Sequence, residues 1–408
     1  MPTAIKSVKQ SFVSSPELLE MMETFKRMVN DCIRIGLRND ASTMKRLSKL
    51  SYSQLARYNI VSYYKLHAIS KAAGILANRK QSIKRGYQTK TPYLKKGILV
   101  SCYGFKIADQ ILRVPIGNRQ YFDIPLNRYA NKILFDSVVR VRSFTLTASS
   151  TVSICYSKEV GEVECDTISG ADRNLANLTV GNERGGVQYN LSQSVDIVEN
   201  TRSIVRSFKR NDVRIRKKIA GKYGQRRQNR INQLLHHVSK QVVAKAKQEK
   251  TAIAFEKLTC IRRLYEKGNH HGRNYRSRLN GWSFAEIKRQ IEYKAQWEGV
   301  PVIQLSVTQT RGTSKVCPQC GKRIQEAHYK DVIHERQLWC SKCLKWMDRD
   351  VVAAMNIARK GGEVFHRSKG DASEAMKGNP TTPVILRVDA SKLARGLSLK
   401  LTEPALAK

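Results

Sequence analysis

The sequence predicts a multidomain α/β protein of 408 residues, in which a helical module, a small β-barrel or sandwich and a mixed α/β domain follow one another. Three changes of pattern support this prediction. Apolar residues recur at helical spacing near the N-terminus, alternating β-branched segments replace them from about residue 95, and strands alternate with helices after residue 165. A chain of this length can bury more than one hydrophobic core, so several domains are expected.

The N-terminal part begins with a short strand, IKSVKQSF, and continues as a helical module. The first helix is expected to begin at Ser15-Pro16-Glu17, because serine caps helices, proline fits the first helical position and an acid suits the first turn. Apolar residues then recur at intervals of three and four: Leu18, Met22, Phe25, Val29 and Cys32. A similar pattern runs through residues 51–86, so two or three helices are expected after the first strand.

The next segments, GILVSCYGFKI, QILRVPIG, VVRVRSFTLTAS and TVSICYSKEV, alternate and predict the remainder of the β domain. Residues 200–250 predict a long helix or helical hairpin with one apolar face and many Arg and Lys on the others. Because few acids are present to pair with these cations, phosphate contact is a better interpretation than a merely solvated face. From residue 365 onward the sequence lacks periodicity, and a weakly structured tail is expected.

The charge of the chain indicates a polyanionic partner. Lys and Arg number 74 and Asp and Glu 33, which gives a net charge of 74 − 33 = +41. Such an excess attracts polyphosphates over a long range, whereas the apolar fraction of 41% is that of a folded protein. No run approaches the ~18 apolar residues of a membrane span, and the N-terminus lacks the apolar core of a signal peptide. No membrane partner is therefore expected, and the expected location is the cytoplasm, or the nucleus if the source is eukaryotic.

Four of the nine cysteines form two Cys-x2-Cys pairs: Cys317, Cys320, Cys340 and Cys343. Two such pairs separated by nineteen residues are typical of a structural Zn²⁺ site, in which four thiolates leave no open position for water. His328 and His334 lie in the spacer and are not needed as ligands. The scattered cysteines are expected to be buried thiols rather than disulfides: Cys32, Cys102, Cys155, Cys165 and Cys260.

Three acids stand where a strand ends or a helix begins. Asp172 follows TISGA, Glu256 follows TAIAF, and Asp350 opens the helix VVAAMNIARK. Each alone has a structural explanation, as a turn residue, a solvated strand end or a helix cap. Together, in a chain with few acids, they predict a site for two Mg²⁺ ions, which can activate water for phosphodiester hydrolysis.

The segments GADRNLANL, IAFEKL, TSKVCPQCG and DRDVVAAMNIA, in this order, resemble the RuvC-like nuclease domain of the TnpB family. That family consists of transposon-associated RNA-guided endonucleases related to the type V CRISPR effectors. The segment YKAQWEGVPVIQL also resembles the family's helix and strand before the zinc ribbon. The resemblance covers about residues 165–360 and extends to residues 1–165 by architecture alone.

The fold that this resemblance implies is a RuvC-like (RNase H-like) nuclease domain with an inserted zinc ribbon. It is preceded by a wedge-type β-barrel that carries an inserted helical recognition module. The implied boundaries are the first barrel strand (1–14), the helical recognition module (15–92), the remainder of the barrel (93–164), the nuclease domain (165–311), the zinc ribbon (312–346), the last nuclease motif (347–364) and the weakly structured tail (365–408).

The resemblance also implies roles and partners. Asp172, Glu256 and Asp350 would be the catalytic Mg²⁺ ligands, Asp348 a bystander, and the zinc ribbon would handle the target strand. The implied activity is Mg²⁺-dependent cleavage of double-stranded DNA beside a short adjacent motif, directed by a guide RNA. The protein is expected to act as a monomer in a ribonucleoprotein in the prokaryotic cytoplasm, on the nucleoid when bound to its target. Tyr52, Tyr58, Tyr63 and Tyr64 are candidates for guide or duplex contact, with the helix core as an equal alternative.

One departure from the family pattern leaves alternatives open. After the first acid the family usually has an apolar residue and glycine, whereas this chain has Arg173 and Asn174. Asn174 is expected to supply the left-handed turn, and Arg173 either pairs with Asp172 or contacts the scissile phosphate. This departure keeps open the alternative of a cleavage-deficient RNA-guided repressor. Two further functions are considered on other grounds: a miniature type V CRISPR effector, with the same chemistry but another RNA source, and, ranked lower, a DNA transposase, because RuvC-like folds also support integration.

Overall fold

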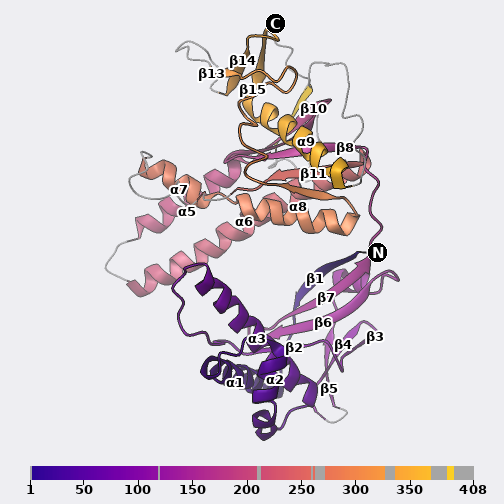
Figure 1. Cartoon of the computed structure of the whole chain (residues 1–408). Coiled ribbons are helices and arrows are strands. Elements are labelled where there is room, and N and C mark those ends of the chain that lie inside the picture. The colour runs from indigo at the N-terminus through magenta and orange to yellow at the C-terminus, as the bar shows by residue number, and fades with distance from the viewer. Residues whose placement is uncertain are drawn as a thin grey trace. The chain divides into compact units, whose positions relative to one another are not determined.

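The computed structural model describes residues 2–117, 120–208, 213–258, 261, 272–326, 336–368 and 384–389. The chain divides into two compact units (Figure 1). One comprises Thr3–Glu159, and the other comprises Met1–Pro2 together with Val160–Lys408. We describe each unit by itself. Among the helices in the described ranges, none is long and apolar enough to cross a membrane.

The helices between residues 15 and 86 of the Thr3–Glu159 unit follow the predicted pattern, whereas α4 (Arg128–Leu134), within the segment predicted to be β structure, was not predicted. The former are α1 (Pro16–Arg38), α2 (Met44–Ser51), the short 3-10 helix η1 (Ser53–Arg57) and α3 (Ser62–Lys84). The expected cap of α1 is confirmed, because the Ser15 hydroxyl accepts a hydrogen bond of 3.2 Å from the backbone N–H of Leu18. Helices α1 and α3 pack through Phe25 and Tyr64, whose rings meet edge to face at 6.5 Å.

Two antiparallel sheets complete this unit. The first has the order β1-β7-β6-β2 and the second the order β3-β4-β5. Their strands are β1 (Thr3–Ser11), β2 (Ile98–Ser101), β3 (Lys106–Ala108), β4 (Ile111–Pro115), β5 (Tyr121–Pro125), β6 (Arg140–Thr147) and β7 (Thr151–Glu159). Helices α1 to α3 therefore lie between the first two strands in the sequence, as expected of an inserted helical module.

A six-stranded mixed sheet organises the other unit, in the order β12-β11-β8-β9-β10-β16. The strands are β8 (Thr167–Arg173), β9 (Asn177–Asn182), β10 (Gly185–Asn190), β11 (Thr251–Glu256), β12 (Val302–Leu305) and β16 (Val384–Asp389). Strands β8, β11 and β12 are parallel, so their C-terminal ends meet at one edge of the sheet. Strand β9 is antiparallel to both β8 and β10.

One face of this sheet is covered by α9 (Arg349–Ser368) (Figure 1). The helix approaches β8 so closely that a β-carbon at Gly170 would collide with the backbone of Ala354 and Ala358. Only glycine fits at this position. The opposite face packs against α6 (Val213–Gln248) and α8 (Phe284–Glu298), with α5 (Ser192–Ser207) and α7 (Arg273–Gly281) beside them. The long basic helix expected within residues 200–250 is thus confirmed as α6.

The tail differs from the expectation of weak structure. Helix α9 continues to Ser368, and β16 pairs in parallel with β10. The segment VILRVD was overlooked because Gly, Ser and Pro residues surround it, but an open sheet edge offers its backbone hydrogen-bond partners. The rest of the tail lies outside the described residues.

The scattered cysteines agree with the expectation only in part. Cys32 and Cys165 are buried, and Cys155 is half-buried. The expectation is wrong for Cys102, which is exposed, with its Sγ 3.3 Å from Nε2 of His67. Cys260 lies outside the described residues.

Candidate active site

Asp172 and Glu256 lie at the C-terminal ends of the neighbouring parallel strands β8 and β11. Ala171 pairs with Phe255 in the register of these strands, so the two acids follow side by side. Residues two apart share a face of a strand, and Asp172 therefore faces the same side as Gly170, against which α9 packs. The structure thus brings two of the three predicted acids together on the α9 face.

Asp350 enters the same place from the first turn of α9, where it is buried. The cap of this helix is the neighbouring Asp348, whose carboxylate accepts hydrogen bonds from the N–H groups of Asp350, at 2.9 Å, and Val351, at 3.1 Å. Gln188 of β10 donates a further hydrogen bond of 3.0 Å to Asp348. Asp348 therefore fixes the corner between β15 (Lys345–Asp348) and α9, and Asp350 is not the helix cap.

The three acids influence one another electrostatically. Burial, and then the negative charges of Glu256 and Asp350, raise the pKa of Asp172 to about 7. Burial also raises the pKa of Glu256, against the opposing effect of Arg173. The oxygens of the three acids are not gathered within 4.8 Å of one another, as the ligand atoms of the cysteine cluster are.

Two asparagines orient these carboxylates. The side chain of Asn174 donates to Asp172 at 2.8 Å and to the Asn177 side chain at 3.2 Å. Asn177 in turn donates to Asp350 at 2.9 Å. The expected left-handed conformation of Asn174 is wrong, because it is not among the residues with positive φ. Asn177 was missed, since nothing in the sequence indicates a bond to a residue 173 positions away.

Arg173 is placed in neither of the two expected ways. It faces away from Asp172, as the next residue of a strand must, and its guanidinium is buried on the α6 side of the sheet. It donates to the backbone carbonyls of Glu256, at 2.7 Å, and Phe284, at 3.0 Å, and lies 5.6 Å from the centre of the Phe255 ring. Arg173 thus joins the ends of β8 and β11 to the start of α8.

Arg336 is a second residue that the sequence did not reveal. Its guanidinium donates to the carboxylate of Asp350 and, at 3.4 Å, to the side-chain oxygen of Asn174. The side chain is half exposed, whereas the Asp350 side chain is 2% exposed. Arg336 therefore presents a cation at the edge of the acid cluster. It precedes Asp350 by fourteen residues in a segment without a recognisable motif.

The four predicted zinc ligands do converge. Cys317 Sγ lies 3.8 Å from Cys343 Sγ, and Cys320 Sγ lies 3.5 Å from Cys340 Sγ. A tetrahedral ion with Zn–S bonds of about 2.3 Å places its sulfurs about 3.8 Å apart, so the cluster fits zinc. Each pair forms a similar knuckle, because the residue after its second cysteine, Gly321 or Leu344, has positive φ. Strands β13 (Gln325–Glu326), β14 (Gln337–Cys340) and β15 form a small sheet beside them.

The cysteine cluster is fastened to the helix that carries Asp350. Asn356 of α9 donates to the carbonyls of Thr313 and Val316, both at 2.7 Å. Val352, from the same helix, packs in one apolar cluster with Cys317 and Cys340. Helix α9 thus both carries Asp350 and holds the segment that contains the four cysteines. His328 and His334 lie outside the described residues.

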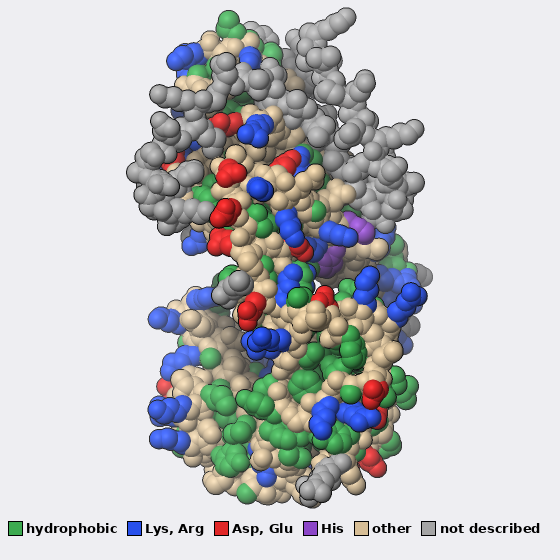
Figure 2. Space-filling model, turned by 90° about the vertical axis from the view of Figure 1, so that its right-hand side faces the viewer, with side chains coloured by type: hydrophobic (Ala, Val, Ile, Leu, Met, Phe, Trp, Pro, Cys, Tyr) green, Lys and Arg blue, Asp and Glu red, His purple; other side chains and the backbone are tan. Residues whose placement is uncertain are grey.

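The predicted tyrosines of the other unit have mixed roles. Tyr64 is fully buried and donates to the carbonyl of Pro115 at 2.9 Å, and Tyr58 donates to Asp31 at 2.6 Å. Tyr52 is exposed. On the face drawn in Figure 2, hydrophobic side chains gather on part of this unit, with Lys and Arg side chains nearby. Other exposed aromatic residues of the unit, absent from the predicted set, are Tyr87, Tyr93, Tyr103, Tyr121, Tyr129 and Phe135.

Comparison with known proteins finds a family model and solved structures that are similar to this chain. Residues 284–357 match the family model "Cas12f1-like, TNB domain". The solved structure of the mini-RNA-guided endonuclease CRISPR-Cas_phi3 is similar with a TM-score of 0.50 at 10% identity, over 88% of this chain and 92% of that chain. A CRISPR-Cas12f ternary complex matches with a TM-score of 0.35 at 16% identity, over 85% and 82% of the two chains.

Two curated proteins of Methanocaldococcus jannaschii are similar in sequence. TnpB-like protein MJ1635 is 25% identical over 390 residues, which cover 90% of this chain and 86% of that protein. TnpB-like protein MJ0751 is 30% identical over 226 residues, which cover 52% of this chain and 76% of that protein. The resemblance noted in the sequence is therefore confirmed, and the chain belongs to the TnpB family.

Proposed function

We propose that this protein is an RNA-guided DNA endonuclease whose cleavage site consists of Asp172, Glu256 and Asp350. The observation that carries the proposal is the meeting of these acids, from two adjacent strand ends and one helix start, on one face of a sheet. A chain of net charge +41 does not need clustered acids to remain in solution, so solubility does not explain this cluster. Crowded carboxylates beside a surface that attracts polyphosphates suit metal-assisted phosphodiester hydrolysis.

The donor set fits divalent magnesium. All three groups offer hard carboxylate oxygens, and burial together with the charges of Glu256 and Asp350 raises the pKa of Asp172, so a bound cation would stabilise its ionised form. Two bound Mg²⁺ ions would supply an activated water and stabilisation of the leaving oxygen. The chain's own contribution is orientation: Asn174 holds Asp172, and Asn177 holds Asp350.

Arg336 suits the binding of the substrate phosphate. Its guanidinium is half exposed at the edge of the acid cluster, where a phosphodiester approaching the acids would pass. Guanidinium groups bind phosphate oxygens through paired hydrogen bonds, which fixes the orientation of the phosphate. We therefore assign Arg336 to phosphate binding and the acids to metal binding.

The proposal that an RNA guides this protein to its target rests on similar proteins, because the acid cluster alone does not indicate a guide RNA. The chain matches proteins named TnpB-like, and a protein of similar fold is titled an RNA-guided endonuclease. Guide RNA would then pair with the target strand of double-stranded DNA, while the protein reads a short adjacent motif. The basic faces of α6 and the exposed aromatic residues of the Thr3–Glu159 unit are suited to the RNA and DNA backbones and bases. A monomer in the ribonucleoprotein is part of this proposal.

The placement of Arg173 favours cleavage over the alternative of a cleavage-deficient repressor. That alternative rested on the departure at Asp172-Arg173-Asn174, in which Arg173 could pair with Asp172. The guanidinium instead donates to two backbone carbonyls on the opposite side of the sheet. A miniature type V CRISPR effector would use the same chemistry with a different source of RNA.

The proposal is tested by co-expressing the protein with its flanking genomic DNA and sequencing the RNA that copurifies. The complex is then incubated with Mg²⁺ and a plasmid library that has a randomised flank beside the target. Wild type is expected to cut beside one short motif. Asp350→Ala should bind the same RNA and fail to cut, whereas Asp166→Ala, at an exposed acid just before β8, should cut normally. Absence of a defined RNA, or cutting by Asp350→Ala, would refute the proposal.

A further inference from the structure

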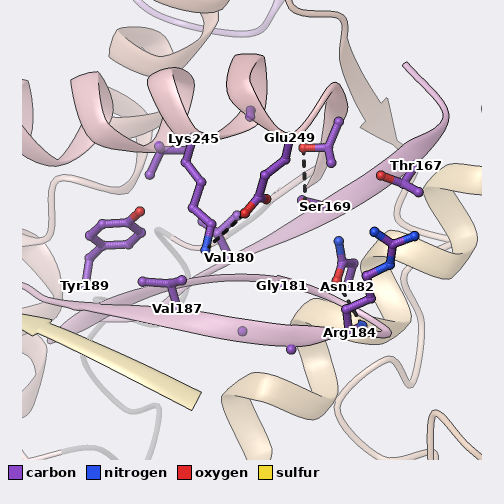
Figure 3. Close-up of a pocket in the computed structure, with 15 residues that line it drawn as sticks. Thr167, Ser169, Val180, Gly181, Asn182, Arg184, Val187, Tyr189, Lys245 and Glu249 are labelled. Atoms are coloured by element: carbon purple, nitrogen blue, oxygen red, sulfur yellow. Dashed lines mark hydrogen bonds and ion pairs between the residues drawn. The ribbon is translucent and has the colours of Figure 1, made fainter. Parts of the chain in front are cut away.

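A cavity of about 270 Å³ lies on the other face of the same sheet, beneath the C-terminal part of α6 (Figure 3). Its floor includes Thr167 and Thr251, the first residues of β8 and β11, whereas Asp172 and Glu256 lie at the opposite ends of these strands. The cavity is therefore separate from the acid cluster. It is formed entirely within the unit that contains Val160–Lys408.

The floor of the cavity is polar where the rest of this face is apolar. Further along the same strands, Ala171, Ile253 and Phe255 pack into the core beneath α6. At the cavity these positions are taken by Thr167, Ser169 and Thr251, and the hydroxyls of the last two lie 3.4 Å apart. The Ser169 hydroxyl donates to that of Thr251, which replaces part of the lost hydration, and the three hydroxyls keep this part of the face polar.

Tyr189 is the most informative residue of the lining. It is 3% exposed, and Figure 3 shows its hydroxyl pointing from β10 toward α6. No hydrogen-bond partner of this hydroxyl occurs among the residues that the structure describes. Burial and the nearby charge of Glu249 raise its pKa, so the group stays protonated and can donate. The hydroxyl is not one of the buried side-chain atoms that lack a partner, so it is open to the cavity, where it can donate to a ligand.

The mouth of the cavity adds charges of both signs. Lys245 and Glu249, one turn apart on α6, form an ion pair at 3.5 Å and are both partly exposed (Figure 3). Arg184 lies exposed on the opposite rim, in the turn between β9 and β10. The site thus combines a carboxylate acceptor, a hydroxyl donor and two cations, one on each side of the opening.

We propose that this cavity binds one nucleobase that carries an exocyclic amino group, with its phosphate held at the mouth by Lys245 and Arg184. Glu249 would accept from the amino group, and Tyr189 would donate to a ring nitrogen. Val180 and Val187 offer apolar contact to the ring faces. The volume is just below the ~300–1,000 Å³ of sites for drug-sized ligands, which suits a single ring system.

The choice of a nucleobase among heterocycles rests on the proposed function, because a guided nuclease holds RNA and DNA at its surface. The base can come from a free nucleotide or from a nucleotide turned out of a bound strand. Both sources offer the same chemistry to the cavity, so the experiment has one arm for each.

The first arm titrates AMP, CMP and UMP into the purified protein by calorimetry. AMP or CMP should bind more tightly than UMP, which lacks an amino group. Tyr189→Phe should weaken that binding about five- to tenfold, the effect of one neutral hydrogen bond, without lowering the melting temperature. Ala246→Phe, which fills the cavity from α6, should abolish binding. Failure of wild type to bind AMP and CMP, equal binding of UMP, or unchanged binding by Tyr189→Phe each contradicts the free-nucleotide form.

The second arm probes the ribonucleoprotein with dimethyl sulfate, which methylates unpaired adenine and cytosine. One base should be protected in the wild-type complex and reactive in the Ala246→Phe complex. Protection identifies a strand nucleotide as the source, and mononucleotide binding without protection identifies a free nucleotide. If neither occurs while wild type still cuts its target, the cavity inference fails and the endonuclease proposal stands. Asp350→Ala should keep the cavity intact in both arms.

Discussion

At the scale of single residues, neighbours in the sequence have separate tasks because a strand turns them to opposite faces. Asp172 faces the acid cluster, and Arg173 faces α6. The side chain of Asn174 donates a hydrogen bond to the carboxylate of Asp172. The sequence DRN, which departs from the usual family pattern, therefore combines one acid with two supports for the acids around it.

Replacing Arg173 with Met should destabilise the protein and impair metal use. The substitution keeps much of the side-chain volume but leaves two buried carbonyls, of Glu256 and Phe284, without their donors. We expect a loss of about 1–3 kcal/mol in the free energy of unfolding, measured with urea. The Mg²⁺ concentration needed for half-maximal cleavage should also rise, because the backbone of Glu256 loses its support.

The matched control is Arg142→Met, at an exposed arginine of β6, which should change neither quantity. An Arg173→Met protein as stable as wild type would show that the buried guanidinium contributes nothing to holding the strand ends.

The raised pKa of Asp172 predicts that this acid destabilises the metal-free fold. The folded-state pKa of about 7 exceeds the ordinary value of 3.8, so the folded protein binds the proton more tightly than the unfolded chain does. The destabilisation is absent below about pH 4, grows as the pH rises and is complete above about pH 7. Without added Mg²⁺, Asp172→Asn should therefore melt at a higher temperature than wild type at pH 8, with a smaller difference at pH 5. A difference that is constant with pH would show that ionisation of the buried Asp172 carboxyl does not destabilise the fold.

At the scale of elements, α9 connects the zinc module to the acid cluster. Its first turn holds Asp350, its middle packs against Gly170, and Asn356 fastens the loop before the first cysteine pair. A helix fixed at these points gives the third acid a defined position relative to the strand ends.

Loss of the zinc ion should therefore impair cleavage even though all three acids remain. Cys320→Ser is expected to lower the zinc content, measured by atomic absorption, from one ion per chain to nearly none. Cleavage should fall with it, because the module that packs on Val352 loses its fold. Cys155→Ser, at a half-buried cysteine of β7, should retain zinc and activity. A zinc-free Cys320→Ser protein with full cleavage activity would show that the cysteine cluster is not needed for cleavage.

Much of the element structure could be predicted, because local patterns determine it. Helical spacing identified α1 and its cap, strand ends identified Asp172 and Glu256, and cysteine spacing identified the zinc ligands. Asn177 and Arg336 could not be predicted, since their bonds to Asp350 exist only after distant segments pack together. The strand β16 was missed because its pairing depends on a free edge at β10.

At the scale of the whole molecule, the net charge of +41 determines how strongly nucleic acid is attracted. Each cation that contacts a phosphate releases condensed counterions, so the affinity falls as salt rises. With six to ten such contacts at ~0.7 released ions each, guide RNA binding should weaken by about 300- to 16,000-fold between roughly 50 and 200 mM salt. Filter binding across this range measures the slope.

The long helix α6 should contribute to that slope. Replacing the exposed Lys222, Arg226 and Arg230 by Gln should reduce the number of released ions by about two, at ~0.7 per phosphate contact for a single strand. An unchanged slope would show that this basic helix face does not contact the RNA.

The most direct test of the central claim is the single-turnover rate at which the guide complex cuts one matched target with saturating Mg²⁺. We expect Asp172→Asn to lower this rate by more than the ~10- to 100-fold typical of losing a group that merely supports a metal ligand, while RNA and target binding stay unchanged. Cutting by Asp172→Asn at the wild-type rate would contradict the claim that these acids form the cleavage site.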